Sequence, residues 1–155
     1  MLDKPRIIYV DDEENNLMSM KATYQREFDI VTAISADEAV KILDEDEEGF
    51  NIILTDQRMP DKTGIEFLQE VKDKYPDSVR ILITGYTDIE AVIDVIDKGE
   101  IFRYVEKPWD ANELRVTFLN AHEVFTLKRT NEALNSKLKD VNRQPEFLLR
   151  QNLIS

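Results

Sequence analysis

Short apolar runs alternate along this chain with segments whose apolar residues recur at helical spacing. Five runs predict β-strands: RIIYV (6–10), FDIVTAI (28–34), NIILT (51–55), RILIT (80–84) and IFRYV (101–105). Three of them show no polar alternation, which is typical of central parallel strands that are covered on both faces. The hydrophobic pattern therefore predicts a sheet in the interior of the molecule.

Between these runs the pattern is that of amphipathic helices. One stripe at spacing i, i+3, i+4, i+7 is formed by Ile89, Val92, Ile93 and Ile96. Helix starts are marked by capping pairs, namely Ser35 with Glu38, Thr63 with Glu66, Thr87 with Glu90, and Asp110 with Glu113. The resulting βαβαβαβαβα order predicts an α/β fold in which helices cover both faces of a parallel sheet.

Composition narrows the class of protein. The chain has 155 residues, 42% of them hydrophobic, which suits one compact domain with some additional chain. It has no cysteine, which excludes disulfides, zinc-thiolate sites and thiol catalysis. The run IIYV is too short for a signal peptide or membrane span, and a net charge of -12 disfavours binding to nucleic acid. We therefore expect a cytoplasmic protein without a membrane or nucleic-acid partner.

Polar residues stand at the carboxyl ends of the predicted strands, where parallel α/β sheets have their functional crevice. Asp11 and Asp12 follow the first strand, Asp56 the third, Thr84 ends the fourth and Lys107 follows the fifth. Three neighbouring carboxylates raise one another's pKa unless a cation joins them. Mg²⁺ suits such a site because it binds one or two carboxylates and leaves room for a phosphate. The pattern predicts phosphoryl chemistry.

Four motifs occur in order at these strand ends: VDDEE, TDQRMPDKTG, ITGYT and YVEKPW. With them the chain from about residue 5 to residue 125 resembles the receiver domain of two-component response regulators. The resemblance implies a flavodoxin-like, doubly wound (βα)5 fold whose five-stranded parallel sheet has the order 2-1-3-4-5. It also implies a phosphorelay role, in which a histidine kinase or phosphotransfer protein donates the phosphoryl group.

The resemblance assigns a role to each motif residue. Asp56 would be the phosphoacceptor, and Mg²⁺ would be bound by Asp11, Asp12, Asp56 and the backbone carbonyl of Arg58. Lys107 and Thr84 would bind the phosphoryl group, Thr84 and Tyr104 would form the switch pair, and the peptide bond before Pro108 would be cis. Such a domain catalyses only its own phosphorylation and dephosphorylation. No turnover of a separate substrate is expected.

Each of these residues, taken alone, also fits a structural role. The two adjacent acids suit a helix start, Asp56 a turn, Lys107 a solvated charge, Thr84 a strand-end hydroxyl and Tyr104 a half-buried aromatic. Their occurrence together at adjacent strand ends is what favours the functional interpretation. His122, the sole histidine, is interpreted as a packing or helix-surface residue and not as a ligand.

We expect a receiver domain in residues 1–125 and a helical extension in residues 126–155. An a/d pattern typical of a coiled coil is formed by Val124, Leu127, Asn131, Leu134, Leu138 and Val141. It favours a homodimer through this helix, while the fourth helix, fifth strand and fifth helix offer a second dimer surface. The alternative is a signalling helix that leads to an output module.

Two other function classes fit part of the pattern. A pseudo-receiver would use the fold as an unphosphorylated interaction or dimerisation scaffold, but it would not need the full set of acids, hydroxyl and lysine. A haloacid-dehalogenase-type phosphatase would have a second aspartate two residues after its nucleophile, where this chain has Arg58. The phosphorylated receiver is therefore the preferred interpretation.

Overall fold

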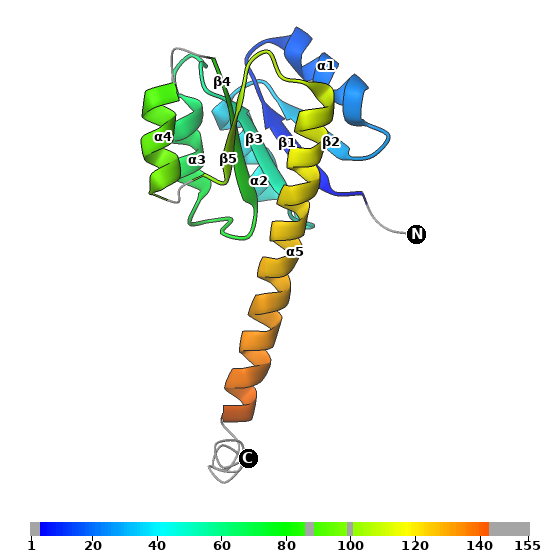
Figure 1. The fold of residues 1–155 in the computed structure, drawn as a ribbon, viewed down its shortest axis with the longest axis vertical. Coiled ribbons are helices and arrows are strands. Elements are labelled where there is room, and N and C mark those ends of the chain that lie inside the picture. Colours follow the sequence, from blue (N-terminus) through cyan, green and yellow to red (C-terminus); the bar gives the residue numbers. More distant parts are fainter. Residues whose placement is uncertain (1–3, 86–88, 99–100, 143–155) are drawn as a thin grey trace. The chain divides into compact units, whose positions relative to one another are not determined.

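The computed structural model describes residues 4–85, 89–98 and 101–142. Strands and helices alternate along the chain as β1 (Arg6–Val10), α1 (Glu14–Tyr24), β2 (Asp29–Ala33), α2 (Ala36–Glu45), β3 (Ile52–Asp56), α3 (Gly64–Val71), β4 (Val79–Thr84), α4 (Ile89–Asp97), β5 (Arg103–Glu106) and α5 (Ala111–Asn142). The strands form one parallel sheet of order β2-β1-β3-β4-β5 (Figure 1). The predicted fold class and strand order are confirmed.

Each face of the sheet is covered by its own group of helices. On one face, α1 and α5 pack on the alternate strand residues that include Ile7, Tyr9, Leu54 and Ile81. On the other face, α2, α3 and α4 cover a second set that includes Ile8, Val10, Ile53 and Leu82. Because successive strand residues point to opposite faces, two cores require strands that are apolar on both sides. That requirement explains the unbroken apolar runs in the sequence.

Three of the four capping pairs lie within the described residues, and each forms a side-chain cap. Thr63 and Glu66 make a reciprocal capping box at the start of α3. Ser35 accepts a hydrogen bond from the backbone of Glu38 at the start of α2. Asp110 accepts one from the backbone of Glu113 near the start of α5. The pair of Thr87 and Glu90 lies partly outside the described residues.

Some element boundaries and one buried face differ from the prediction. β3 continues through Asp56, and β5 begins only at Arg103, after the buried Ile101. Among the described side chains of α4, Val92 and Val95 are buried, whereas Ile93 is 44% exposed. The predicted apolar stripe of this helix is therefore wrong at Ile93. Three apolar residues within four positions fit more than one helical phase, and the contact with the sheet selects among them.

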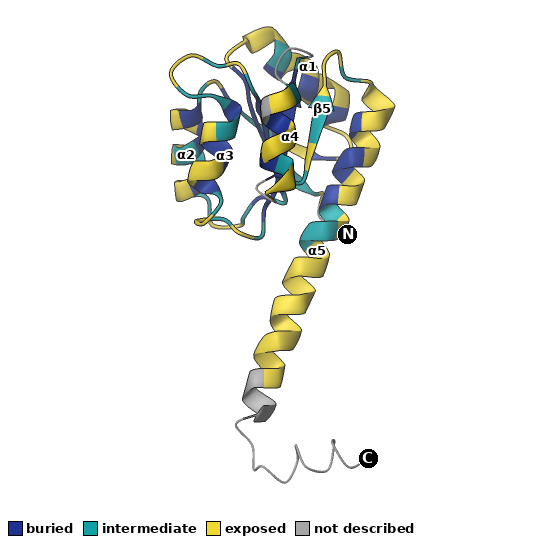
Figure 2. Cartoon of the chain, turned by 60° about the vertical axis from the view of Figure 1, so that its left-hand side comes forward, coloured by how far each residue is buried: buried dark blue, intermediate teal, exposed yellow. Residues whose placement is uncertain are grey.

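The chain divides into two units, Met1–Phe125 and Thr126–Ser155. All the strands and α1 to α4 belong to the first unit. In the second, residues 126–138 are exposed throughout, including Leu127, Leu134 and Leu138 (Figure 2). Across the described parts of the chain, no helix is both long enough and apolar enough to span a membrane.

Candidate functional site

The carboxyl ends of β1 and β3 bring three aspartates together. Asp11 and Asp12 directly follow β1, and Asp56 is the last residue of β3. Each of the three contributes a carboxylate oxygen, and these oxygens all lie within 4.8 Å of one another. Asp11 and Asp56 are buried, with 1% and 4% of their surface exposed, while Asp12 is exposed. The sheet therefore holds two buried carboxylates beside a third that reaches the surface.

Asp56 is held as a partly desolvated acid. Burial raises the pKa of its carboxyl group, and the charges of Asp11 and Asp12 raise it further. The ammonium group of Lys107 opposes this rise because it is hydrogen bonded to Asp56 and attracts the ionised form. The ion pair joins Lys107 Nζ to Asp56 Oδ1, and the lysine side chain itself remains 38% exposed. The lysine thus pairs with one of the three acids.

Asp11 is oriented by three hydrogen-bond donors. The Tyr9 hydroxyl donates to Oδ2 at 2.6 Å, and the Asn16 side-chain amide donates to the same oxygen at 3.0 Å. The backbone N–H of Glu13 donates to Oδ1 at 2.9 Å. Burial, followed by the bond to Asp11, raises the pKa of Tyr9, so its phenol remains a donor at neutral pH. The carboxylate of Asp11 is consequently fixed before any ligand arrives.

The loop after Asp56 depends on a glycine. A Cβ atom at Gly64 would lie 2.4 Å from the backbone oxygen of Asp56 and 2.7 Å from a methyl group of Leu82. Gln57 joins this loop to the start of α3, because its backbone oxygen accepts from Gly64 N and its side-chain oxygen from Ile65 N. The absence of a side chain at Gly64 therefore permits the close approach of α3 to Asp56.

Backbone contacts hold Lys107 beside the end of β4. Its N–H donates to the carbonyl oxygen of Thr84 at 2.9 Å, and the Lys107–Pro108 peptide bond is cis. Thr84 is fully buried, and its hydroxyl donates to the backbone oxygen of Gly85 at 3.3 Å. The hydroxyl and the ammonium group therefore belong to adjacent strand ends on the same edge as Asp56.

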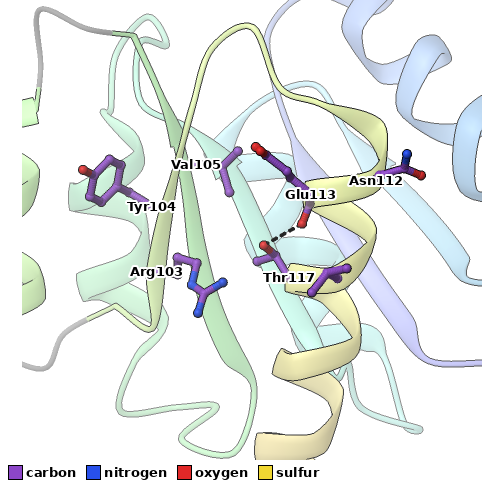
Figure 3. A pocket seen from close by; sticks show the side chains of 7 residues that line it. Arg103, Tyr104, Val105, Asn112, Glu113 and Thr117 are labelled. Atoms are coloured by element: carbon purple, nitrogen blue, oxygen red, sulfur yellow. Dashed lines mark hydrogen bonds between the residues drawn. The ribbon is translucent and has the colours of Figure 1, made fainter.

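Tyr104 lies near a groove between β5 and α5. The groove has a volume of about 470 Å³ and is lined by Arg103, Tyr104, Val105, Asn112, Glu113, Val116 and Thr117. Tyr104 is half-buried and lies on the side of β5 away from α5 (Figure 3). Thr117 donates a hydrogen bond to the backbone oxygen of Glu113, one turn earlier on the helix. The Tyr104 ring thus packs with the core beneath α2, α3 and α4.

The donor set at this edge fits Mg²⁺. Carboxylate oxygens are the ligands that this hard cation prefers, and it binds few of them at a time. The raised pKa of Asp56 reflects burial and negative neighbours, and a divalent cation would relieve the repulsion among the acids. Arg58, whose backbone carbonyl is the remaining predicted ligand, is an exposed residue two positions after Asp56.

The structure brings the predicted aspartates, Thr84 and Lys107 to one edge of the sheet. Tyr104 lies back from this edge, because it pairs with Leu82, two residues before Thr84 on β4. His122 lies elsewhere: it is half-buried in α5, and its Nδ1 accepts a hydrogen bond from Asn51 at 3.0 Å. Sequence reasoning missed Tyr9. A tyrosine two residues before a buried aspartate points to the same side of the strand, and that spacing was the available signal.

Comparisons with known proteins agree with this geometry. The model of the family described as the response regulator receiver domain matches residues 7–118. The hydrogenase transcriptional regulatory protein HoxA of Cupriavidus necator is 38% identical over 133 residues, which are 86% of this chain and 27% of that protein. The chain thus spans about a quarter of the length of the first curated relatives it matches.

Two solved structures show the same fold. One, described as adenylate cyclase from Rhodopirellula baltica, has a TM-score of 0.84 and 27% identity, and the match covers 87% of this chain and 99% of that one. A response regulator receiver domain protein from Clostridium thermocellum has a TM-score of 0.75 and 29% identity, with 79% and 98% covered.

Proposed function

Because this chain belongs to the response regulator receiver family, we propose that Asp56 accepts a phosphoryl group from a histidine kinase or phosphotransfer protein. The observation that supports this assignment most directly is the placement of Asp56 at the buried end of β3, between Asp11, Asp12 and Lys107. An ordinary turn aspartate would not require two further acids and a cation around it.

The proposed transfer is a nucleophilic displacement at phosphorus. An oxygen of Asp56 supplies the electron pair of the new O–P bond, while the P–N bond to the donor's imidazole breaks. The electron pair of that bond stays with the imidazole, which then takes up a proton. The product is an aspartyl phosphate. The rigid end of β3 fixes the nucleophile. The reaction is accelerated mainly by the positioning of the reactants and by electrostatic stabilisation of the transferring group.

Asp11, Asp12, Asp56 and the backbone carbonyl of Arg58 would hold Mg²⁺. When bound, Mg²⁺ would screen the repulsion between the carboxylates and the incoming phosphoryl group. Lys107, now paired with Asp56, would pair instead with a phosphoryl oxygen of the product. The lysine can do so with a small movement because its side chain is already at the site and partly exposed.

The same proposal gives Thr84 and Tyr104 a role in signalling. The Thr84 hydroxyl now donates to a backbone oxygen at 3.3 Å, which is a long hydrogen bond that a phosphoryl oxygen could replace. Movement of Thr84 would change the space beside Tyr104, whose half-buried ring lies on the neighbouring strand. Phosphorylation would then shift a population between two side-chain arrangements of β5.

The test is the intact mass of the protein after incubation with Mg²⁺ and acetyl phosphate. We expect one added phosphoryl group in the wild type and none in Asp56→Asn. Asp61→Asn is the matched control, because Asp61 is an exposed acid in the same loop and its positive φ of 70° suits asparagine. It should be modified like the wild type.

Equal modification of Asp56→Asn and the wild type would contradict the site. No modification of the wild type, together with no binding of beryllofluoride and Mg²⁺, would favour the unphosphorylated scaffold.

We also propose that two copies pair, in the cytoplasm, either through the exposed leucines of α5 or through the face formed by α4, β5 and α5. The leucines Leu127, Leu134 and Leu138 are 53–63% exposed and follow the a/d spacing of a coiled coil.

Replacing all three leucines by glutamine keeps the helix propensity and removes the apolar contact. Sedimentation should then show a weaker dimer, whereas unchanged association would point to the second face. The matched control is glutamine at the exposed polar position Asn135.

A further inference from the structure

Tyr9 is the residue that the proposed function leaves unexplained. It is 1% exposed and belongs to the apolar core beneath α1 and α5, yet its hydroxyl reaches the acidic cluster and donates to Asp11 Oδ2 at 2.6 Å. A phenylalanine would fill the same core volume. The hydroxyl is therefore needed for something other than packing.

The two oxygens of Asp11 are not equivalent. An ionised carboxylate offers roughly two acceptor positions on each oxygen. Oδ2 accepts from both Tyr9 and Asn16, so its two positions are used, whereas Oδ1 accepts from one donor, the N–H of Glu13, among the described residues. Only Oδ1 keeps an acceptor position for a cation, or for a water molecule bound to one.

This asymmetry bears on the choice of cation. Mg²⁺ binds carboxylates through single oxygens and keeps several waters, whereas Ca²⁺ accepts more ligands and often takes both oxygens of one carboxylate. An Asp11 whose Oδ2 is occupied by two protein donors is poorly suited to two-oxygen chelation. Binding of Mg²⁺ also requires little ordering of the Asp11 side chain, because its hydrogen-bond partners already fix the carboxylate.

We propose that Tyr9 is a positioning residue that restricts Asp11 to contact through Oδ1 and thereby favours Mg²⁺ over Ca²⁺ at the phosphorylation site. The proposal rests on the proposed function, since it concerns the same cation site. Asn16 shares the task, because it donates to the same oxygen from α1. Neither residue would touch the phosphoryl group or the nucleophile.

The experiment is calorimetric titration of the full chain with Mg²⁺ alone and with Ca²⁺ alone. For Tyr9→Phe we expect Mg²⁺ affinity to fall about tenfold, the size of effect usual for loss of a residue that orients a metal ligand. Ca²⁺ affinity should stay the same or rise, since Oδ2 becomes available. Asn16→Ala should change the ratio of the two affinities in the same direction.

Tyr24→Phe is the matched control. Tyr24 is buried in the same core, and its hydroxyl donates to the backbone oxygen of Ala111 at 2.7 Å, not to an acid. Tyr24→Phe removes a hydroxyl group from the same core, as Tyr9→Phe does, and should leave the affinities for Mg²⁺ and Ca²⁺ unchanged. Thermal unfolding of each variant checks that the fold is retained.

The remaining outcomes separate the two proposals. If the wild type binds Mg²⁺ but Tyr9→Phe loses affinity for both cations by the same factor, Tyr9 has a general structural role and the inference is wrong. Unchanged affinities for both cations in Tyr9→Phe would overturn it as well. If the wild type binds no Mg²⁺, the proposed cation site fails and the inference fails with it.

Discussion

The two ends of the sheet carry the same combination of charges with different consequences. At the carboxyl end, Asp11, Asp12 and Asp56 gather beside Lys107. At the amino end, Arg6 forms ion pairs with Asp46 at 2.8 Å, Asp29 at 3.2 Å and Glu48 at 3.8 Å. At the amino end the cation pairs with all three carboxylates, whereas at the carboxyl end the described ion pair joins Lys107 to Asp56.

Burial distinguishes the two clusters. The Asp29 and Glu48 side chains are 53% and 79% exposed, so water screens them and only Asp46 depends strongly on Arg6. At the other end Asp11 and Asp56 are both buried, and their repulsion is screened less. The exposed cluster at the amino end is therefore balanced by Arg6 and water. The buried cluster at the carboxyl end would be stabilised by an added cation.

Further hydrogen bonds and a cation–π contact stabilise the amino-end cluster. The guanidinium group of Arg6 donates to the backbone oxygen of Gly49 and lies 4.3 Å from the centroid of the Phe50 ring. Its backbone N–H donates to the side chain of Asn51, which in turn donates to His122 in α5. These bonds join β1, α5 and the loop before β3, so this cluster serves the stability of the fold.

The largest effect is expected beneath the reactive end, where packing leaves no room. Gly64→Ala should lower the free energy of unfolding by about 3 kcal/mol, because the new methyl group overlaps the Asp56 carbonyl and Leu82. Gly85→Ala is the matched control, since among the described residues other than its chain neighbours no atom lies within 4 Å of a Cβ there, and the free energy of unfolding should change by less than about 0.5 kcal/mol. Urea denaturation measures both, and equal effects would contradict the close approach.

A smaller pair of effects tests the comparison itself. Asp46→Asn should lower the free energy of unfolding by about 2 kcal/mol. One carboxylate oxygen of Asp46 accepts from Arg6 and the other from the N–H of Gly49, whereas an asparagine side chain has one acceptor oxygen. Asp12→Asn should slightly raise stability in Mg²⁺-free buffer, because it removes a charge that repels Asp56 and raises its pKa.

Added Mg²⁺ sharpens the contrast between these two variants. A ligand that binds only the folded state raises stability, so Mg²⁺ should stabilise the wild type and Asp46→Asn in urea denaturation. Asp12→Asn should lose most of that rise, because one of the three acids is gone. If Mg²⁺ stabilised all three proteins equally, the cation would bind outside the acidic cluster.

Much of the site was predictable because it lies at strand ends. The apolar runs located the strands, and the rule that parallel strands share a carboxyl edge then placed the aspartates, Thr84 and Lys107 together. Tyr9 and Asn16 were not predicted, because a tyrosine in an apolar run is usually a core residue, and only the contact with Asp11 gives its hydroxyl a role.

The order of elements, the apolar strands and the helix caps follow from the sequence alone, because these depend on residues that are close along the chain. The buried face of α4, the approach of α3 to Asp56 through Gly64 and the occupied oxygen of Asp11 come from the folded arrangement. Those features depend on distances between atoms of different elements. Burial, which separates the reactive cluster from the structural one, exists only once the two layers of helices have closed on the sheet.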